Sequence, residues 1–174
     1  MKIILQTERT YLREYREEDA ESFYRLNSDP AVIRFTGDDP LISLPQARTI
    51  LLQHPIADYR LRGFGRWACI CRRSDEVIGF AGFKYLPERR EIDLGYRFLP
   101  EFWGRGLATE VCRVLIRHGF DVVNLSEITA LVQSENVASV RVLEKCGLLF
   151  TELVRYQGRT VARYRLQKTA VIPD

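Results

Sequence analysis

The chain has 174 residues, 46% of them hydrophobic and 28% charged, with a net charge of +3 at pH 7. This length and composition predict a single domain over residues 1–174 with an apolar core, and the mild charge excludes the concentrated basic face of a nucleic-acid-binding protein. No apolar run approaches the roughly 18 residues of a membrane span, and the apolar stretch at residues 3–5 is too short for a signal peptide, so we expect a cytoplasmic protein without a membrane partner.

The first third of the chain predicts one strand and two helices. Residues 10–15 alternate at period two, which is typical of a strand, and residues 17–27 carry apolar side chains at helical spacing. A second helix is predicted to begin at Ser43 or Leu44, just before a first-turn proline. Pro55 should break or kink this helix.

The rest of the chain predicts six strands and two helices. The strands cover residues 65–71, 76–85, 91–99, 127–132, 148–156 and 160–167, and the helices cover residues 104–122 and 136–145. Short turns at residues 72–75 and 157–158 indicate hairpins, and Gly147 takes the position of a helix-terminating glycine. This order of elements predicts one mixed α/β domain.

The cysteines and histidines do not form a metal-binding pattern. Four cysteines stand at positions 69, 71, 112 and 146, and the chain has two histidines. None of the cysteine spacings fits a zinc site. We therefore predict no metal and four buried, reduced thiols.

A glycine-bearing turn joins a predicted strand to a predicted helix at residues 94–110. A helix start offers unpaired backbone N–H groups and a partial positive charge, which suit a phosphate ligand. Gly104 and Gly106 would let this backbone approach a ligand without an intervening Cβ. A simple tight turn explains the two glycines equally well.

Two other phosphate-binding motifs fail against this segment. The P-loop string Gly-x-x-x-x-Gly-Lys-Ser/Thr is absent from the chain. The dinucleotide fingerprint Gly-x-Gly-x-x-Gly lacks its third glycine, because Thr109 stands there, and the turn lies past mid-chain.

The same turn resembles the pyrophosphate loop of the GNAT acetyltransferase superfamily, which reads Gln/Arg-x-x-Gly-x-Gly/Ala. The matching residues are Trp103-Gly104-Arg105-Gly106-Leu107-Ala108. Trp103 replaces the usual Gln or Arg, and the wider string from Gly95 to Glu110 resembles the branch of RimJ/RimL-type ribosomal-protein N-acetyltransferases.

A second stretch, residues 136–148, resembles the superfamily motif Asn-x-x-Ser/Ala-x-x-x-Tyr/Leu-Glu-Lys-x-Gly-Phe. Asn136 could bind the pantetheine amides through its donor and acceptor, or cap the helix. The resemblance covers nearly the whole chain. It implies a mixed, mostly antiparallel sheet of six to seven strands that splays at the acetyl-CoA site, flanked by about four helices.

The resemblance also implies how acetyl-CoA is held. Pantetheine would enter a gap between the strand that ends at Phe98 and the strand at residues 127–132, and the N–H near Phe98 would contact the oxyanion. The implied cofactor-binding residues are Phe98, Leu99, Trp103, Gly104, Arg105, Gly106, Leu107, Ala108, Thr109 and Asn136.

Three residues are candidates for the chemistry. Leu143 stands where many relatives place a proton-donating Tyr, so Ser139 is assigned as the thiolate partner, with a surface or packing role as the alternative. Asp93 and Glu91 share one strand face, and Asp93 could draw a proton from the acceptor through water. Alternatively, Asp93 is an exposed charge or pairs with Arg97 or Arg89.

The sequence indicates least about the identity of the acceptor. By resemblance, residues 36–62 and the hairpin at residues 156–159 select a primary amine, either a small molecule or a protein N-terminus. The pair Asp38-Asp39 could receive a cation or form an acidic turn. The alternative function is a non-catalytic acyl-CoA-binding regulatory module, and the assembly is expected to be a monomer or homodimer.

Overall fold

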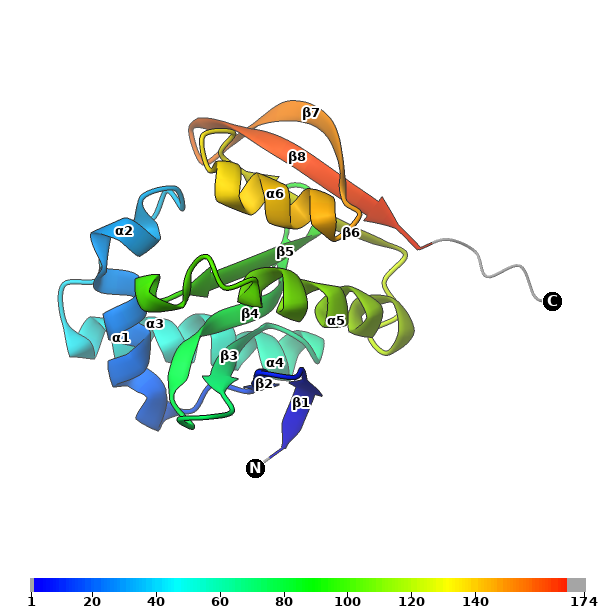
Figure 1. Cartoon of the computed structure of the whole chain (residues 1–174). Helices are drawn as coiled ribbons and strands as arrows, with labels where there is room; N and C mark the ends of the chain where they lie inside the picture. Colours follow the sequence, from blue (N-terminus) through cyan, green and yellow to red (C-terminus); the bar gives the residue numbers. More distant parts are fainter. Residues whose placement is uncertain (1, 169–174) are drawn as a thin grey trace.

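The computed structural model describes residues 2–168; Met1 and residues 169–174, which the predicted domain includes, lie outside them. Eight strands form one sheet in the order β1-β2-β3-β4-β5-β6-β8-β7, in which β5 and β6 are the parallel neighbours and the other pairs are antiparallel (Figure 1). The strands are β1 (Ile3–Gln6), β2 (Thr10–Arg13), β3 (Arg66–Cys71), β4 (Val77–Leu86), β5 (Glu91–Phe98), β6 (Glu127–Val132), β7 (Leu149–Tyr156) and β8 (Arg159–Gln167).

Helices cover both faces of this sheet. They are α1 (Ala20–Ser28), α2 (Pro30–Ile33), α3 (Leu44–Leu51), α4 (Ala57–Arg62), α5 (Leu107–Asp121) and α6 (Val137–Lys145), with short 3-10 turns at Glu17–Asp19 and Pro100–Phe102. The mixed α/β fold is confirmed, with eight strands where the sequence predicts six to seven.

Side-chain alternation along the strands builds two cores. Trp67 and Phe83 face α5, while Ala68 and Phe80, which lie one residue from Trp67 on β3 and three residues from Phe83 on β4, face α1 and α3. Successive residues of a strand point to opposite faces, so β3 and β4 are buried on both sides. Their sequences are accordingly almost continuously apolar.

The N-terminal third departs most from the predictions. Strand β1 was not predicted, because it is a short edge strand whose residues are exposed or half-buried and show no clear alternation. Strand β2 ends at Arg13. Pro55 does not end the second helix: α3 continues through a π-helical turn at Leu52–Ile56 into α4. A π-turn shifts the hydrogen-bond pattern and so accommodates a residue without an N–H.

The C-terminal half follows the predictions closely. Strand β6 has the predicted bounds, and Gly147, with φ of 88°, follows α6 in the left-handed conformation of a helix-ending glycine. Helix α5 begins three residues later than predicted, at Leu107, because Gly104 and Gly106 have φ of 71° and 76° and are not helical. The glycines therefore form the entry to the helix.

The four cysteines are free, and the expectation that all are buried is wrong for two of them. Cys69 and Cys112 lie in the core, whereas Cys71 at the end of β3 and Cys146 at the end of α6 are half-buried. Within residues 2–168, no three His, Cys, Asp or Glu side chains cluster as metal ligands, and no helix has the length and apolarity to cross a membrane.

Candidate active site

A cavity of about 810 Å³ opens beside β5 and extends along the starts of α5 and α6. The segment at residues 31–38 and the turn between β7 and β8 complete its walls, and both lie on the same side of the molecule (Figure 1). The structure brings ten of the thirteen predicted site residues to this cavity. Glu91, Leu99 and Arg105 are the three that do not line it.

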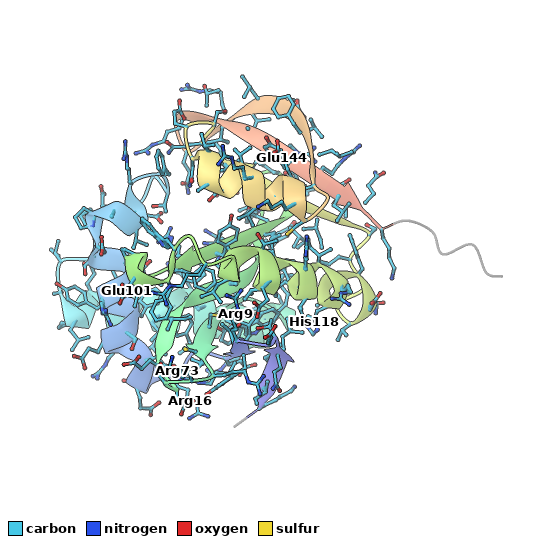
Figure 2. The ribbon with its side chains drawn as sticks, viewed as in Figure 1. Arg9, Arg16, Arg73, Glu101, His118 and Glu144 are labelled. Carbon is cyan, nitrogen blue, oxygen red and sulfur yellow. The ribbon has the colours of Figure 1, made fainter. Side chains whose placement is uncertain are left out.

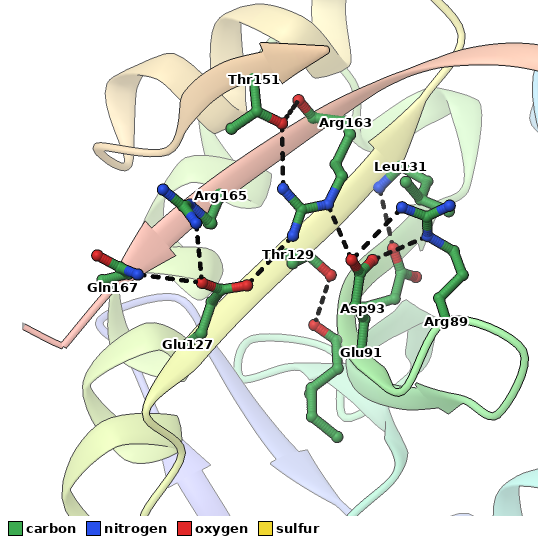
Figure 3. Close-up of polar contacts among 11 residues, drawn as sticks. Arg89, Glu91, Asp93, Glu127, Thr129, Leu131, Thr151, Arg163, Arg165 and Gln167 are labelled. Atoms are coloured by element: carbon green, nitrogen blue, oxygen red, sulfur yellow. Dashed lines mark hydrogen bonds and ion pairs between the residues drawn. The ribbon is translucent and has the colours of Figure 1, made fainter. Parts of the chain in front are cut away.

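The cavity begins where β5 and β6 part. The two strands are paired in register at Asp93 and Thr129, and no further pair joins them in the described part of the chain. Two side-chain bonds hold the point of parting: Thr129 Oγ1 donates to Ile92 O at 3.0 Å, and Asp93 Oδ1 accepts from Leu131 N at 3.0 Å (Figure 3). From residue 94 onward, the β6 side of β5 therefore lines a gap.

Backbone groups of β5 point into this gap. Leu99 N donates to Ile78 O at 2.9 Å, which fixes the odd-numbered residues of β5 as the ones bonded to β4. In an antiparallel ladder the intervening residues face the other way, so the N–H and C=O of Tyr96 and Phe98 point toward the gap. Trp103 Nε1 donates to Phe98 O at 2.6 Å, a contact that the sequence did not predict.

Residues 103–106, the glycine loop, lead into the start of α5, which lines the same cavity. The first helical bond runs from Glu110 N to Gly106 O, and no hydrogen bond to another described residue occupies the N–H groups of Leu107, Ala108 and Thr109. A Cβ at Gly104 would meet nothing within 4 Å. The positive φ, and not crowding, therefore explains why this position is glycine.

Arg9, which the sequence analysis missed, fixes the glycine loop from the opposite end of the chain (Figure 2). Its Nη1 donates to Arg105 O at 2.8 Å, and its Nε donates to Glu110 Oε2 at 2.7 Å. One guanidinium thus ties the β1–β2 connection to both the loop and the first turn of α5. No local pattern around Arg9 signals this contact.

Helix α6 contributes a cap and one hydroxyl group to the cavity, and β5 contributes a second hydroxyl group. Asn136 Oδ1 accepts from Ser139 N at 3.2 Å, so the alternative reading of Asn136 as a helix cap is confirmed. The Ser139 hydroxyl makes no hydrogen bond to the described residues, and the Tyr96 hydroxyl donates to Ser139 O at 3.5 Å. Burial raises the pKa of Tyr96, which keeps its phenol protonated at neutral pH. Leu143 is buried beside them.

Asp93 is buried and pairs with an arginine that the sequence did not single out. Arg66 Nη2 donates to Asp93 Oδ2 at 3.0 Å, so the expected alternatives of an exposed charge or a pair with Arg97 or Arg89 are wrong. Burial raises the pKa of Asp93, although Arg66 and the Leu131 N–H oppose this shift. The carboxyl group therefore takes up a proton more readily than an exposed aspartate.

Glu91 lies outside the cavity in a separate ion-pair network (Figure 3). Arg163 Nε donates to Glu91 Oε1 at 3.0 Å, Arg89 Nε donates to Glu91 Oε2 at 2.9 Å, and Arg163 also reaches Glu127. Because arginines bind both of its oxygens, Glu91 joins β5 to β8 and has no part in the proposed chemistry.

Arg97 lies on the same face of β5 as Asp93, because residues an even number of positions apart on a strand share a face. Arg97 donates to Asp38 and, at 2.6 Å, to Asn27 Oδ1 on α1. Burial favours the neutral form of Asp38, but Arg97, together with Thr36 and Arg66, outweighs burial and lowers the pKa of this carboxyl. Asp38 is therefore ionised and already paired. We call the end of the cavity lined by Arg66, Lys84, Asp93 and Arg97 the charged end.

Comparisons with known proteins agree with this geometry. A sequence model of the GNAT acetyltransferase domain matches residues 9–149. The chain is 35% identical over 161 residues to the uncharacterized N-acetyltransferase YoaA of Bacillus subtilis (strain 168), with 90% of each chain covered. It is 24% identical over 137 residues to spermidine N(1)-acetyltransferase of Escherichia coli (strain K12), covering 78% of this chain and 70% of that protein.

The solved structure of RimL, a ribosomal L7/L12 alpha-N-protein acetyltransferase in complex with coenzyme A, has the same fold. Its TM-score is 0.82 at 19% identity, with 95% of this chain and 98% of that chain covered. The family match spans most of the chain and includes the glycine loop, Asp93 and Ser139. The chain therefore belongs to the GNAT family of acetyltransferases.

Proposed function

We propose that this protein transfers the acetyl group of acetyl-CoA to a primary amine within a ternary complex. One observation carries the proposal: a single cavity joins the free N–H groups at the start of α5, the open edge of β5 and the Asp93 carboxyl. Acetyl-CoA has phosphates at one end and a thioester at the other, and the cavity offers helix-start N–H groups for the first and a carboxyl group near the second. The names of the spermidine and RimL relatives, which denote transfer to amines, support the acceptor class.

Each part of the cavity suits one part of the cosubstrate. The N–H groups of Leu107, Ala108 and Thr109 would bind the pyrophosphate, since a helix start favours anions. The gap-facing N–H and C=O groups of Tyr96 would pair with the pantetheine amides as a neighbouring strand does, while Phe98 O already accepts from the Trp103 indole. Asn136 uses its oxygen as the helix cap and keeps its amide N–H donors for the ligand.

The reaction requires two proton movements and one charge to be stabilised. The thioester supplies an activated acyl carbon; the amine nitrogen bonds to it, and the carbon–sulfur bond breaks. Asp93 accepts the proton that the amine loses, directly or through one water, and Ser139 donates the proton that the thiolate takes up. The Phe98 N–H faces the developing oxyanion. The Tyr96 hydroxyl is a second possible proton donor to the thiolate, because it lies at the Ser139 carbonyl.

The position within the family is also part of the proposal. Trp103 at the start of the glycine loop and Ser139, three residues after Asn136, support the RimJ/RimL-type branch, and we propose that residues 1–174 act as one domain. The Trp103 indole also has a structural role, because its hydrogen bond to Phe98 O links the glycine loop to the edge of β5.

The proposal is tested by thiol release from acetyl-CoA in the presence of individual amines and short N-terminal peptides. We expect thiol release that depends on the acceptor, together with a mass increase of the acceptor by one acetyl group. Tight acetyl-CoA binding without acceptor-dependent thiol release across the panel would favour the alternative, a non-catalytic acyl-CoA-binding module.

A further inference from the structure

The charged end of the cavity lies on the sheet face that α1 covers. Phe80 pairs with Arg97, Gly82 with Gly95, and Lys84 with Asp93 across β4 and β5. Residues two apart on a strand share a face, so all six residues point to the same side. This side faces away from α5 and is the natural place for the acceptor if β5 holds the cosubstrate along its edge.

Glycines make room for an arginine on this face. A Cβ at Gly95 would lie 2.6 Å from Arg66 Nη2, so the Arg66 guanidinium lies flat over the Gly95 backbone. The guanidinium carbons Cζ of Arg66 and Arg97 both lie 5.4 Å from the centre of the Phe80 ring. Two positive groups therefore lie over the Phe80 ring at the charged end of the cavity.

Both carboxylates at this end are already neutralised. Arg66 holds Asp93, and Arg97 holds Asp38. Arg66 Nε is also a buried donor without a hydrogen-bond partner among the residues that the structure describes, so this guanidinium has unused donor capacity. A cationic substrate would find no carboxylate here that is not already bound to an arginine.

Lys84 and Arg159 have no acidic partner, and the same holds for three further cations of the cavity lining in the described part of the chain, Arg34, Arg141 and Lys145. Neither Lys84 nor Arg159 forms an ion pair or a side-chain hydrogen bond within the described part of the chain, and both line the cavity. Desolvation at the cavity wall and the nearby Arg66 lower the pKa of Lys84, while Asp93 and Asp38 oppose this shift, so Lys84 and Arg66 repel one another. An anionic group would relieve this repulsion, whereas a second cation would increase it.

Arg159 also brings two walls of the cavity into contact. The Arg159 guanidinium lies within 3.6 Å of the position a Cβ on Gly37 would take, so the β7–β8 turn contacts the segment after α2. Such a bridge leaves room for a small molecule more readily than for an extended peptide.

We propose that the acceptor is a small amine that also carries a carboxylate or phosphate group, bound by Lys84 and Arg159 while Asp93 receives the amine proton. This inference rests on the acetyl transfer proposed above. It opposes the expectation that Asp38 receives a cationic substrate, because Arg97 already occupies that carboxylate.

Pairs of amines that differ only in charge test the proposal. β-Alanine is compared with β-alaninamide, and phosphoethanolamine with ethanolamine, at equal concentrations of unprotonated amine. Spermidine and a short N-terminal peptide complete the panel. We expect the anionic member of at least one pair to have a kcat/KM at least about tenfold higher, as for one charge-assisted hydrogen bond. The carboxylate and phosphate pairs show which anion is preferred.

Two variants test whether Lys84 and Arg159 cause the preference for anionic amines. Arg159→Gln and Lys84→Gln should each reduce the preference for the anionic amine several-fold through KM, with the KM of acetyl-CoA unchanged. Arg155→Gln is the matched control, because Arg155 is exposed on the same hairpin and does not line the cavity. Calorimetric binding of the amine to the CoA-loaded protein should show the same order.

The two proposals fail in different ways. A kcat/KM of β-alaninamide and ethanolamine equal to or higher than that of their anionic partners, or a higher kcat/KM for spermidine or the peptide, would overturn the anionic small-amine acceptor and leave acetyl transfer intact. An unchanged charge preference in both Arg159→Gln and Lys84→Gln would overturn the assigned binding groups. Absence of acceptor-dependent thiol release with every amine would overturn the transfer function and this inference with it.

Discussion

At the glycine loop the groups that face the cavity are backbone N–H and C=O groups, whereas at the charged end they are side chains that pair with one another. The first end depends on local conformation, namely two glycines with positive φ and a helix start. The second end depends on Arg66, Asp38 and Arg159, which come from three distant segments. A short motif can therefore fix cosubstrate binding while acceptor choice varies independently.

The largest effect is expected at the charged end. Asp93→Asn should lower kcat about 100-fold or more, since it removes the proposed base, and leave the KM of acetyl-CoA unchanged. The Asp93 pKa is raised above 3.8, so the ionised, active form is lost as pH falls through that raised value. The ratio of wild-type to variant kcat should therefore decline toward acid pH, because the titration of the acceptor amine cancels in the ratio.

A pH-independent ratio, or a rise in the KM of acetyl-CoA as large as the loss of kcat, would assign Asp93 a purely structural role. Such a role is physically available, because Asp93 Oδ1 also accepts from Leu131 N where β5 and β6 part.

Ser139 lies between the two ends and should give the next largest effect. Ser139→Ala should lower kcat about tenfold or more at saturating acetyl-CoA, because the thiolate then lacks its proton donor. Ser134→Ala, on the exposed turn before α6 and outside the cavity, should leave kcat unchanged. Should Tyr96→Phe cause the larger loss instead, the donor is the Tyr96 hydroxyl.

The glycine loop should respond through binding and not through chemistry. Gly106→Ala places a Cβ in the left-handed region, at a strain of about 1–2 kcal/mol, and should raise the KM of acetyl-CoA about tenfold with little change in kcat. Gly158→Ala is a matched control, since Gly158 has a φ of 75° at the β7–β8 turn and open space around it. This control should lose a similar free energy of unfolding without a change in the KM of acetyl-CoA.

Arg9 should give the smallest effect. Arg9→Gln removes the ion pair with Glu110 and the bond to Arg105 O, and should raise the KM of acetyl-CoA about threefold, because a partly exposed pair contributes about 1 kcal/mol or less. The shift should shrink at high salt. Arg73→Gln, an exposed change away from the cavity, serves as the control; an equal shift there would remove the positioning role of Arg9.

Much of the fold was predictable because its signals are local. The bounds of β6, the hairpin between β3 and β4, and the glycine that ends α6 each depend on periodicity or backbone conformation within about ten residues. Strand β1 and the passage through Pro55 were not predictable in this way. The first is stabilised by its neighbour β2, and the second by the core contacts of α3 and the segment that follows.

The residues of the candidate site show the same difference between local and long-range signals. Gly104, Gly106, Asn136 and Ser139 were recognised from motifs, and the structure brings all four to one cavity. The roles of Arg9, Arg66 and Tyr96 were missed because each is defined by a partner on another element. Glu91 was included because it shares a strand face with Asp93, but strand alternation does not show that its oxygens bind Arg89 and Arg163.

Local sequence sets where the backbone turns, where helices are capped and where N–H groups stay free, because glycines, helix caps and strand alternation act over neighbouring residues. The pairing of charges depends on the folded chain: Arg66 meets Asp93 across 27 positions, Arg97 meets Asp38 across 59, and Arg9 meets Glu110 across 101. With 26 lysines and arginines and 23 acidic residues, composition allows a very large number of pairings. Sheet register and the glycine at position 95 select among them, because they place the long side chains within reach of their partners.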